Sequence, residues 1–247
     1  MGVQLLVLEA LCRVAGLGTT GWLTGCAFAV ATWLVLTLAL RRSWTPSFGM
    51  ANRVTLARTI LVGGVTALVA DSFERPVPVA VLVTLAAVAL ILDAVDGQVA
   101  RRTGTVTPLG ARFDMEVDAF LILVLCVYLA MPLGAWVLAI GLMRYVFVAA
   151  SWPWPWLRGA LPHSMARKTV AALQGVVLVV AGAGVLPPAS AVTAVSGALA
   201  LLVWSFGRDV AWLWRVRGLT GAPAAVHGRD PAEAAPPAMS RRAGPDR

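Results

Sequence analysis

The stretch Asp93-Ala-Val-Asp-Gly-Gln-Val-Ala-Arg-Arg-Thr-Gly-Thr-Val-Thr-Pro-Leu-Gly-Ala-Arg-Phe-Asp-Met-Glu-Val-Asp118 lies between two apolar runs and holds five of the 12 acidic residues of the chain. The spacing i, i+3 places Asp93 and Asp96 on one face of a helix, and the spacing i, i+4 does the same for Asp114 and Asp118. Because an apolar run precedes the first pair and another follows the second, we expect a helical hairpin that directs four carboxylates at one another.

Four carboxylates at a membrane boundary repel one another and are costly to desolvate, so they need compensation. One or two divalent cations with a preference for hard oxygen ligands, Mg²⁺ or Mn²⁺, supply it most simply, and two such ions can bridge a phosphate during in-line displacement. Small residues at Gly97, Ala100 and Gly110 allow close approach of a ligand, and Arg101 can neutralise phosphate oxygens. The alternative is a charged loop that only caps two helices through Asp–Arg pairs.

The composition of the 247 residues indicates a membrane protein. Hydrophobic residues make up 59% of the chain and charged residues 13%, with a mean hydropathy of +0.81, which is too apolar for a soluble domain of this size. The apolar runs are continuous rather than alternating, so helices are expected instead of transmembrane strands. The expected apolar helical stretches are 20–40, 52–70, 79–92, 119–131, 136–150, 169–186 and 189–206.

The distribution of basic residues predicts the orientation. With the acidic stretch on the cytoplasmic side, 17 of the 20 Arg and Lys residues share that side, as the positive-inside rule requires. We therefore expect a multi-pass protein of the cytoplasmic membrane with its site facing the cytoplasm. We attribute the net charge of +8 to this orientation and not to nucleic-acid binding. The expected domains are an N-terminal extension with one helix (1–45), a membrane domain (46–217) and a disordered cytoplasmic tail (218–247), while residues 1–18 form an interfacial helix or half of a hairpin.

The acidic stretch resembles the complete signature of the CDP-alcohol phosphotransferase (CDP-alcohol phosphatidyltransferase) family. The eight positions that define this signature are filled, within 26 residues, by Asp93, Asp96, Gly97, Ala100, Arg101, Gly110, Asp114 and Asp118. The segment with Asn52, Thr55 and Arg58 also resembles the first core helix of the family, which helps to hold the cytidine nucleotide. The looser resemblance extends over about residues 51–207.

The resemblance implies an all-α integral membrane fold with a six-helix core, to which this chain adds an N-terminal apolar helix. It implies transfer of a phosphatidyl group from CDP-diacylglycerol to a small alcohol, with release of CMP, and it implies a homodimer. By analogy Asp93, Asp96, Asp114 and Asp118 would bind two Mg²⁺ or Mn²⁺ ions, and Asp118 would act as the general base. The nucleotide site would be formed by Asn52, Thr55, Arg58, Gly97, Ala100, Arg101 and Gly110.

Three basic residues are candidates for the acceptor site. Arg144 lies within an apolar run, where a charged side chain needs a partner or a substrate, while Arg167 and Lys168 begin the next helix on the side of the acids. Together they could bind a phosphate on the acceptor. Alternatively, Arg144 pairs with a carboxylate of the acidic signature or extends to the interface, and the other two are ordinary positive-inside charges. The sequence leaves the identity of the acceptor open.

Two other classes of function compete with this hypothesis. A transporter or channel would carry acids near the centres of its spans and show repeat symmetry, whereas four acids here lie at one membrane face and no repeat is evident. A non-catalytic scaffold derived from an enzyme would usually lack one of the acids of the signature, and none is missing. Transfer from another CDP-alcohol to a lipid acceptor is a third alternative.

Overall fold

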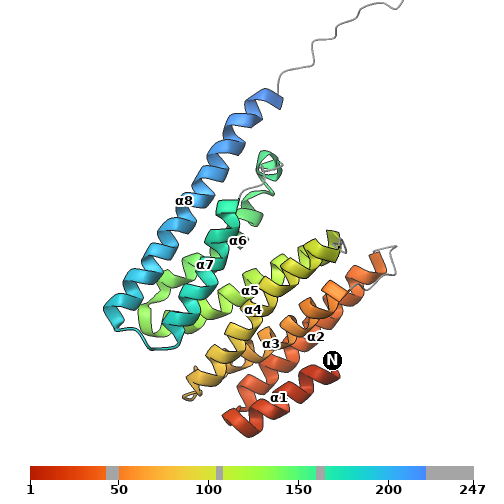
Figure 1. Ribbon diagram of the computed structural model, residues 1–247, viewed down its shortest axis with the longest axis vertical. Coiled ribbons are helices and arrows are strands. Elements are labelled where there is room, and N and C mark those ends of the chain that lie inside the picture. Colours follow the sequence, from red (N-terminus) through yellow and green to blue (C-terminus); the bar gives the residue numbers. More distant parts are fainter. Residues whose placement is uncertain (43–49, 104–107, 160–164, 221–247) are drawn as a thin grey trace, which may run out of the picture.

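The computed structural model describes residues 1–42, 50–103, 108–159 and 165–220, and in these ranges helices joined by short turns and loops form the fold, with no strand (Figure 1). For residues 39, 40, 42, 50–53, 96–103, 108, 109 and 218–220 only the backbone is described. The helices are α1 (Gly2–Ala15), α2 (Thr19–Arg42), α3 (Met50–Asp71), α4 (Val79–Thr103), α5 (Pro108–Leu133), α6 (Leu138–Ala150), α7 (Met165–Gly182) and α8 (Pro188–Thr220). Two short 3₁₀ helices, η1 (Ala135–Val137) and η2 (Pro155–Arg158), flank α6.

The lengths of the helices fit a bilayer. Segments long and apolar enough to cross a membrane occur in five helices of the described chain, namely α2, α3, α5, α7 and α8, since about 20 residues span the hydrocarbon core. The shorter apolar segments Val79–Val95 and Ala135–Ala150 belong to α4 and to η1 with α6. The prediction of an all-α membrane fold, with an apolar helix added before the core, is therefore confirmed.

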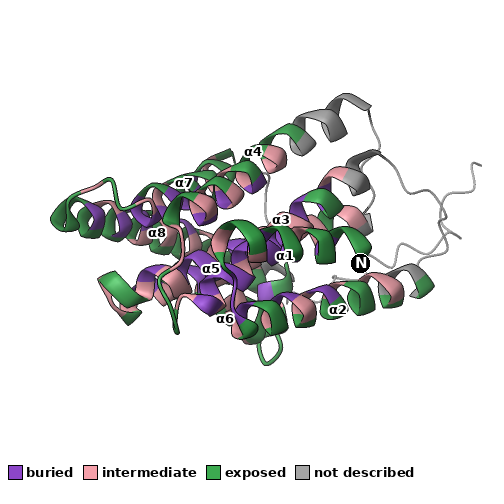
Figure 2. Cartoon of the chain, turned by 90° about the horizontal axis from the view of Figure 1, so that it is seen from below, coloured by how far each residue is buried: buried purple, intermediate pink, exposed green. Residues whose placement is uncertain are grey.

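Helix α3 lies at the centre of the N-terminal half and packs against α1, α2, α4 and α5. Val62, Val65 and Leu68 on this helix are fully buried, whereas α2 and α8 carry many exposed large apolar side chains. Figure 2 shows this pattern, with buried residues on the inner sides of the helices and exposed residues outside. An apolar exterior of this kind is stable only if lipid covers it.

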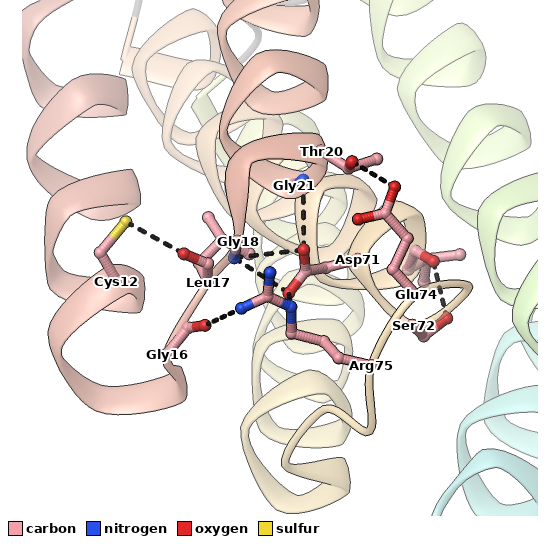
Figure 3. A network of polar contacts seen from close by, with 11 residues as sticks. Cys12, Gly16, Leu17, Gly18, Thr20, Gly21, Asp71, Ser72, Glu74 and Arg75 are labelled. Atoms are coloured by element: carbon pink, nitrogen blue, oxygen red, sulfur yellow. Dashed lines mark hydrogen bonds and ion pairs between the residues drawn. The ribbon is translucent and has the colours of Figure 1, made fainter.

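The first two helices form a hairpin, which is one of the two expected arrangements of residues 1–18. Gly16 ends α1 in the left-handed conformation at φ 63°, where glycine carries no Cβ penalty. Asp71, the last residue of α3, fixes the start of α2: the N–H of Gly18 donates to both carboxylate oxygens, at 3.1 and 3.0 Å, and that of Gly21 donates at 3.4 Å (Figure 3). Arg75 completes the network through an ion pair with Asp71 at 3.4 Å.

Helix α8 differs from the expectation. The sequence predicts an apolar helical stretch at 189–206, but α8 begins at Pro188 and continues through the basic residues after Phe206 to Thr220. Its 33 residues correspond to about 50 Å, which is longer than the hydrocarbon core. The helix continues because the stretch has no proline and because Gly207 does not adopt a positive φ.

Candidate active site

The two helices predicted to carry the acidic stretch bring its described carboxylates together. Asp93 lies toward the C-terminal end of α4, and Asp114 and Asp118 lie in the first turns of α5. One carboxylate oxygen from each of the three residues lies within 4.8 Å of the other two. The predicted convergence therefore holds for these three acids. The side chain of Asp96, the fourth predicted member, is outside the described part of the structure.

An arginine from α3 lies among the three carboxylates. One terminal nitrogen of Arg58, Nη1, contacts Asp93 and lies 2.8 Å from Oδ1 of Asp118, and the other, Nη2, contacts the carboxylate of Asp114. Nη2 also donates to the backbone carbonyl oxygen of Asp114 at 3.1 Å. Because the guanidinium group presents its donors in a planar fork, it can hold several carboxylates at once.

Burial separates the arginine from the acids. The side chain of Arg58 is 1% exposed, whereas the three carboxylates are 32–38% exposed. The acids are thus open to a ligand on the side away from α3, and the arginine forms the floor beneath them. The sequence placed Arg58 only in the nucleotide site; the packing of α3 against α4 and α5 makes it the counter-charge of the cluster.

The donor set is suitable for a divalent cation. Three carboxylates and one guanidinium leave a formal charge of −2 (three negative charges and one positive) among these four groups, which one divalent ion would balance. Two oxygens on opposite sides of one Mg²⁺ lie about 4.2 Å apart, twice the usual Mg–O distance of about 2.1 Å. The separation of up to 4.8 Å is close to this value, so small side-chain rotations would complete a three-ligand site.

The predicted nucleotide-binding residues are described only in part. Thr55 lies one turn before Arg58 on α3 and is buried, with 5% exposure, and its carbonyl oxygen accepts the hydroxyl proton of Thr59. Gly110 lies one turn before Asp114 on α5. The side chains of Asn52, Ala100 and Arg101, and the surroundings of Gly97, are outside the described residues.

Two of the three predicted acceptor residues have protein partners. Arg144 on α6 pairs with Glu116 on α5, so its partner is a carboxylate but not one of the four acids of the signature. By helical spacing Glu116 lies off the face that Asp114 and Asp118 share, and its contact is with α6. Arg167 on α7 pairs with Asp209 on α8 at 3.2 Å, and Lys168 is exposed.

Two polar contacts near these residues were missed from the sequence. Asp209, which is 14% exposed, lies three residues after the apolar run that ends at Phe206, and an acid in that position could have indicated a partner on a neighbouring helix. Glu116 could have been matched with Arg144, since a charge within a span needs a partner. Neither signal alone identifies which helix supplies the partner.

Comparison with known proteins supports the reading of the acidic stretch. The family model described as CDP-alcohol phosphatidyltransferase matches residues 48–206, which include α4, α5 and all the acids of the cluster. No curated protein and no solved structure matches the chain. The matched region covers most of the chain and contains Arg58 with the carboxylates it binds. The chain therefore belongs to the CDP-alcohol phosphatidyltransferase family.

Proposed function

We propose that the protein transfers a phosphatidyl group from CDP-diacylglycerol to a small alcohol and releases CMP, with Mg²⁺ or Mn²⁺ bound by the acidic cluster. The observation that carries the proposal is the convergence of Asp93, Asp114 and Asp118 around Arg58 within the family-matched region. Phospholipid synthesis by a membrane transferase is the activity that the family suggests. The donor, the acceptor class and the metal are the parts proposed here.

The residues of the cluster have distinct roles in this proposal. Asp93, Asp96 and Asp114, together with Asp118, would hold the cations, and these ions would supply neutralisation of the diphosphate charge and stabilisation of leaving CMP. Arg58 orients three of these carboxylates toward one common point. Thr55 with the same arginine, and Asn52, Gly97, Ala100, Arg101 and Gly110, would shape the nucleotide pocket.

Asp118 is proposed as the general base. Its carboxylate accepts the proton of the acceptor hydroxyl while the hydroxyl oxygen forms a bond to the phosphorus that carries the lipid. The bond between this phosphorus and the oxygen that bridges the two phosphates breaks, and CMP leaves with the electron pair. An alcohol is a poor nucleophile at neutral pH, so a positioned carboxylate of this kind contributes directly to the rate.

The acceptor is proposed to approach from the side of Arg144, Arg167 and Lys168. A phosphorylated polyol would exchange the present partner of Arg144, Glu116, for a phosphate group, which forms stronger charge-assisted hydrogen bonds. An Arg144→Gln variant would then raise KM for a phosphorylated acceptor while leaving KM for the donor unchanged. If KM for the acceptor does not change, Arg144 serves only to pair with Glu116.

The location of the acids distinguishes this enzyme from a transporter. Asp93 lies near the end of the apolar segment Val79–Val95, and Asp114 lies near the start of the span Gly110–Leu133, so the cluster is near one membrane face instead of the span centres. We propose that this face is the cytoplasmic side of the cytoplasmic membrane, because most basic residues belong to it in the predicted topology. The proposed domain limits are 1–45, 46–217 and 218–247, and a homodimer is proposed from the family resemblance.

The proposal is tested by CMP release from purified protein in detergent or nanodiscs. CDP-diacylglycerol is supplied with Mg²⁺ or Mn²⁺, and glycerol 3-phosphate, inositol phosphate, inositol, serine and glycerol are added separately. We expect CMP release that depends on one acceptor and that EDTA abolishes. The control variant Glu9→Gln removes one carboxylate from an exposed ion pair of α1, outside the site. It should leave CMP release unchanged. No release with any acceptor would contradict the proposal and favour another donor or a scaffold.

A further inference from the structure

The connection between α6 and α7 packs against the end of α8. The short helix η2 contacts α8, and Leu157 of η2 and Leu213 of α8 are both buried. Gly159 allows the close approach, because a Cβ at this position would lie 2.9 Å from Cδ2 of Leu213. We call the place where residues 155–159 meet residues 213–217 the η2–α8 junction.

A guanidinium group stacks on two indole rings at this junction. The rings of Trp156 and Trp214 meet edge to face, with their centroids 5.5 Å apart. Arg217 follows Trp214 by three residues, so both lie on one face of α8, and its guanidinium lies over the ring of Trp214 and 5.6 Å from the centroid of Trp156. Stacking uses the flat face of a guanidinium, whereas its N–H donors point outward in the plane. The arrangement therefore suits a group that accepts two parallel hydrogen bonds, such as a phosphate.

The two segments that form the junction carry positive charge only. Residues 151–159 and 210–217 contain five tryptophans, three arginines and no acid. Their arginines are all exposed, namely Arg158, Arg215 and Arg217. Asp209, which directly precedes the second segment, pairs with Arg167 at 3.2 Å. The charge of the junction therefore favours an anionic partner.

The junction lies at the level of the lipid headgroups. The 33 residues of α8 correspond to about 50 Å, compared with about 30 Å for the hydrocarbon core and about 40–45 Å for the bilayer with its headgroups. Trp152 and Trp154, in the same connection as η2, are 72% and 54% exposed, and exposed indole rings favour this level. In Figure 1 the C-terminal ends of α4 and α8 point the same way, so the junction is on the membrane side of the acidic cluster.

We propose that the η2–α8 junction binds the headgroup phosphate of an anionic phospholipid, with Arg217 as the ligand and the rings of Trp156 and Trp214 as its support. An arginine near the membrane surface is worth roughly fivefold in affinity for anionic lipid. A zwitterionic headgroup gains less, because its own positive charge lies beside its phosphate. Trp214 and Arg217 lie beyond residues 48–206, which match the family, so the site belongs to the C-terminal extension of α8. It is separate from the acidic cluster and does not depend on the transfer reaction.

Binding to the purified full-length protein tests the charge and the aromatic support separately. The protein in detergent is titrated with phosphatidylglycerol or phosphatidylcholine, and bound lipid is counted by native mass spectrometry. EDTA is present, because the acidic cluster then repels an anionic lipid. We expect Arg217→Gln to weaken binding of phosphatidylglycerol about fivefold and Trp156→Leu, which keeps every charge, to weaken it at least threefold.

The control variant Arg41→Gln removes an exposed arginine from the C-terminal end of α2. It should change the affinity for phosphatidylglycerol less than twofold. Equal affinity of the original protein for the two lipids, or equal losses in Arg217→Gln and Arg41→Gln, would overturn the proposal. Unchanged affinity in Trp156→Leu would also overturn it, because net charge alone would then explain the binding.

A labelling measurement locates the lipid in a bilayer. The protein is reconstituted in phosphatidylcholine vesicles with a small fraction of phosphatidylglycerol that carries a diazirine in its headgroup, and peptides labelled on irradiation are identified by mass spectrometry. We expect labels on η2 and on the last turns of α8, which Arg217→Gln reduces at least threefold and Arg41→Gln does not. Labelling of these segments that Arg217→Gln leaves unchanged would overturn the proposal. Neither measurement requires CMP release, so failure of the proposed reaction would leave both results standing.

Discussion

Replacing Arg58 by methionine removes the counter-charge of the acidic cluster while retaining a long apolar side chain. Two unit charges 4.8 Å apart repel by about 3.5 kcal/mol at an effective dielectric constant of about 20 and by about 0.9 kcal/mol in water. The three carboxylates are about one third exposed, so we expect a repulsion of about 1–2 kcal/mol within each of the three carboxylate pairs. The total of about 3–6 kcal/mol overlaps the cost of about 3–5 kcal/mol for breaking a buried ion pair.

The assay is thermal unfolding in detergent, first in EDTA and then with Mg²⁺. A loss of about 3–6 kcal/mol corresponds to a decrease in Tm of roughly 6–24 °C for a chain of this size. Mg²⁺ should recover part of the loss, because the cation would neutralise the same carboxylates. An Arg58→Lys variant keeps the charge but not the planar fork, and its Tm should lie between those of Arg58→Met and the original protein.

The control is Arg144→Met, which also removes an arginine from a helix of the membrane domain. Arg144 pairs with a single carboxylate, Glu116, which is 55% exposed, so its loss should cost less than about 1 kcal/mol. If Arg58→Met unfolds in EDTA at the Tm of the original protein, or no lower than Arg144→Met, the reasoning about the counter-charge is refuted. If Mg²⁺ raises the Tm of neither the original protein nor Arg58→Met, the assignment of the carboxylates to a cation is refuted.

Two further predictions concern stability away from the site. Asp71→Ala should lower the free energy of unfolding by about 2–4 kcal/mol, because the N–H of Gly18 then loses a buried charged acceptor at the start of α2. Chemical unfolding followed by tryptophan fluorescence measures this loss. A loss under about 0.5 kcal/mol would contradict the capping role. Gly141→Ala should cost about 1–3 kcal/mol, since an added Cβ would lie 2.7 Å from Cα of Leu123 and force α5 and α6 apart. The matched variant Gly197→Ala has nothing within 4 Å of the added Cβ and should be no less stable than the original protein, so equal losses would refute the close approach of α5 and α6.

Hydropathy and spacing predicted the features that depend on neighbouring residues in the sequence. Continuous apolar runs indicate helices whether or not the arrangement of those helices is known. The spacing of Asp114 and Asp118 likewise fixes their shared face from helical geometry alone. Because α4 and α5 both pack against α3, Asp93 lies near the same two carboxylates.

The features that were missed depend on contacts between distant segments. Asp71 directly follows the predicted apolar stretch 52–70, and only the packing of α2 on α3 shows that it is 1% exposed and accepts N–H groups 50 and 53 residues away. Arg58 was assigned to the nucleotide site because its motif is local, whereas its three carboxylate partners lie 35–60 residues further along. Such pairs cannot be identified from periodicity, which describes one helix at a time.

The central claim is that Asp118 is the base of a CMP-releasing transferase, and Asp118→Asn tests it most directly. Purified original protein and variant are compared for CMP release from CDP-diacylglycerol with whichever of the tested acceptors supports release by the original protein, and for Mg²⁺-dependent binding of the same donor. The account predicts a loss of at least about 10²-fold in kcat, as is typical for removal of a general base, with binding of the donor retained. CMP release by Asp118→Asn at the rate of the original protein would contradict the account.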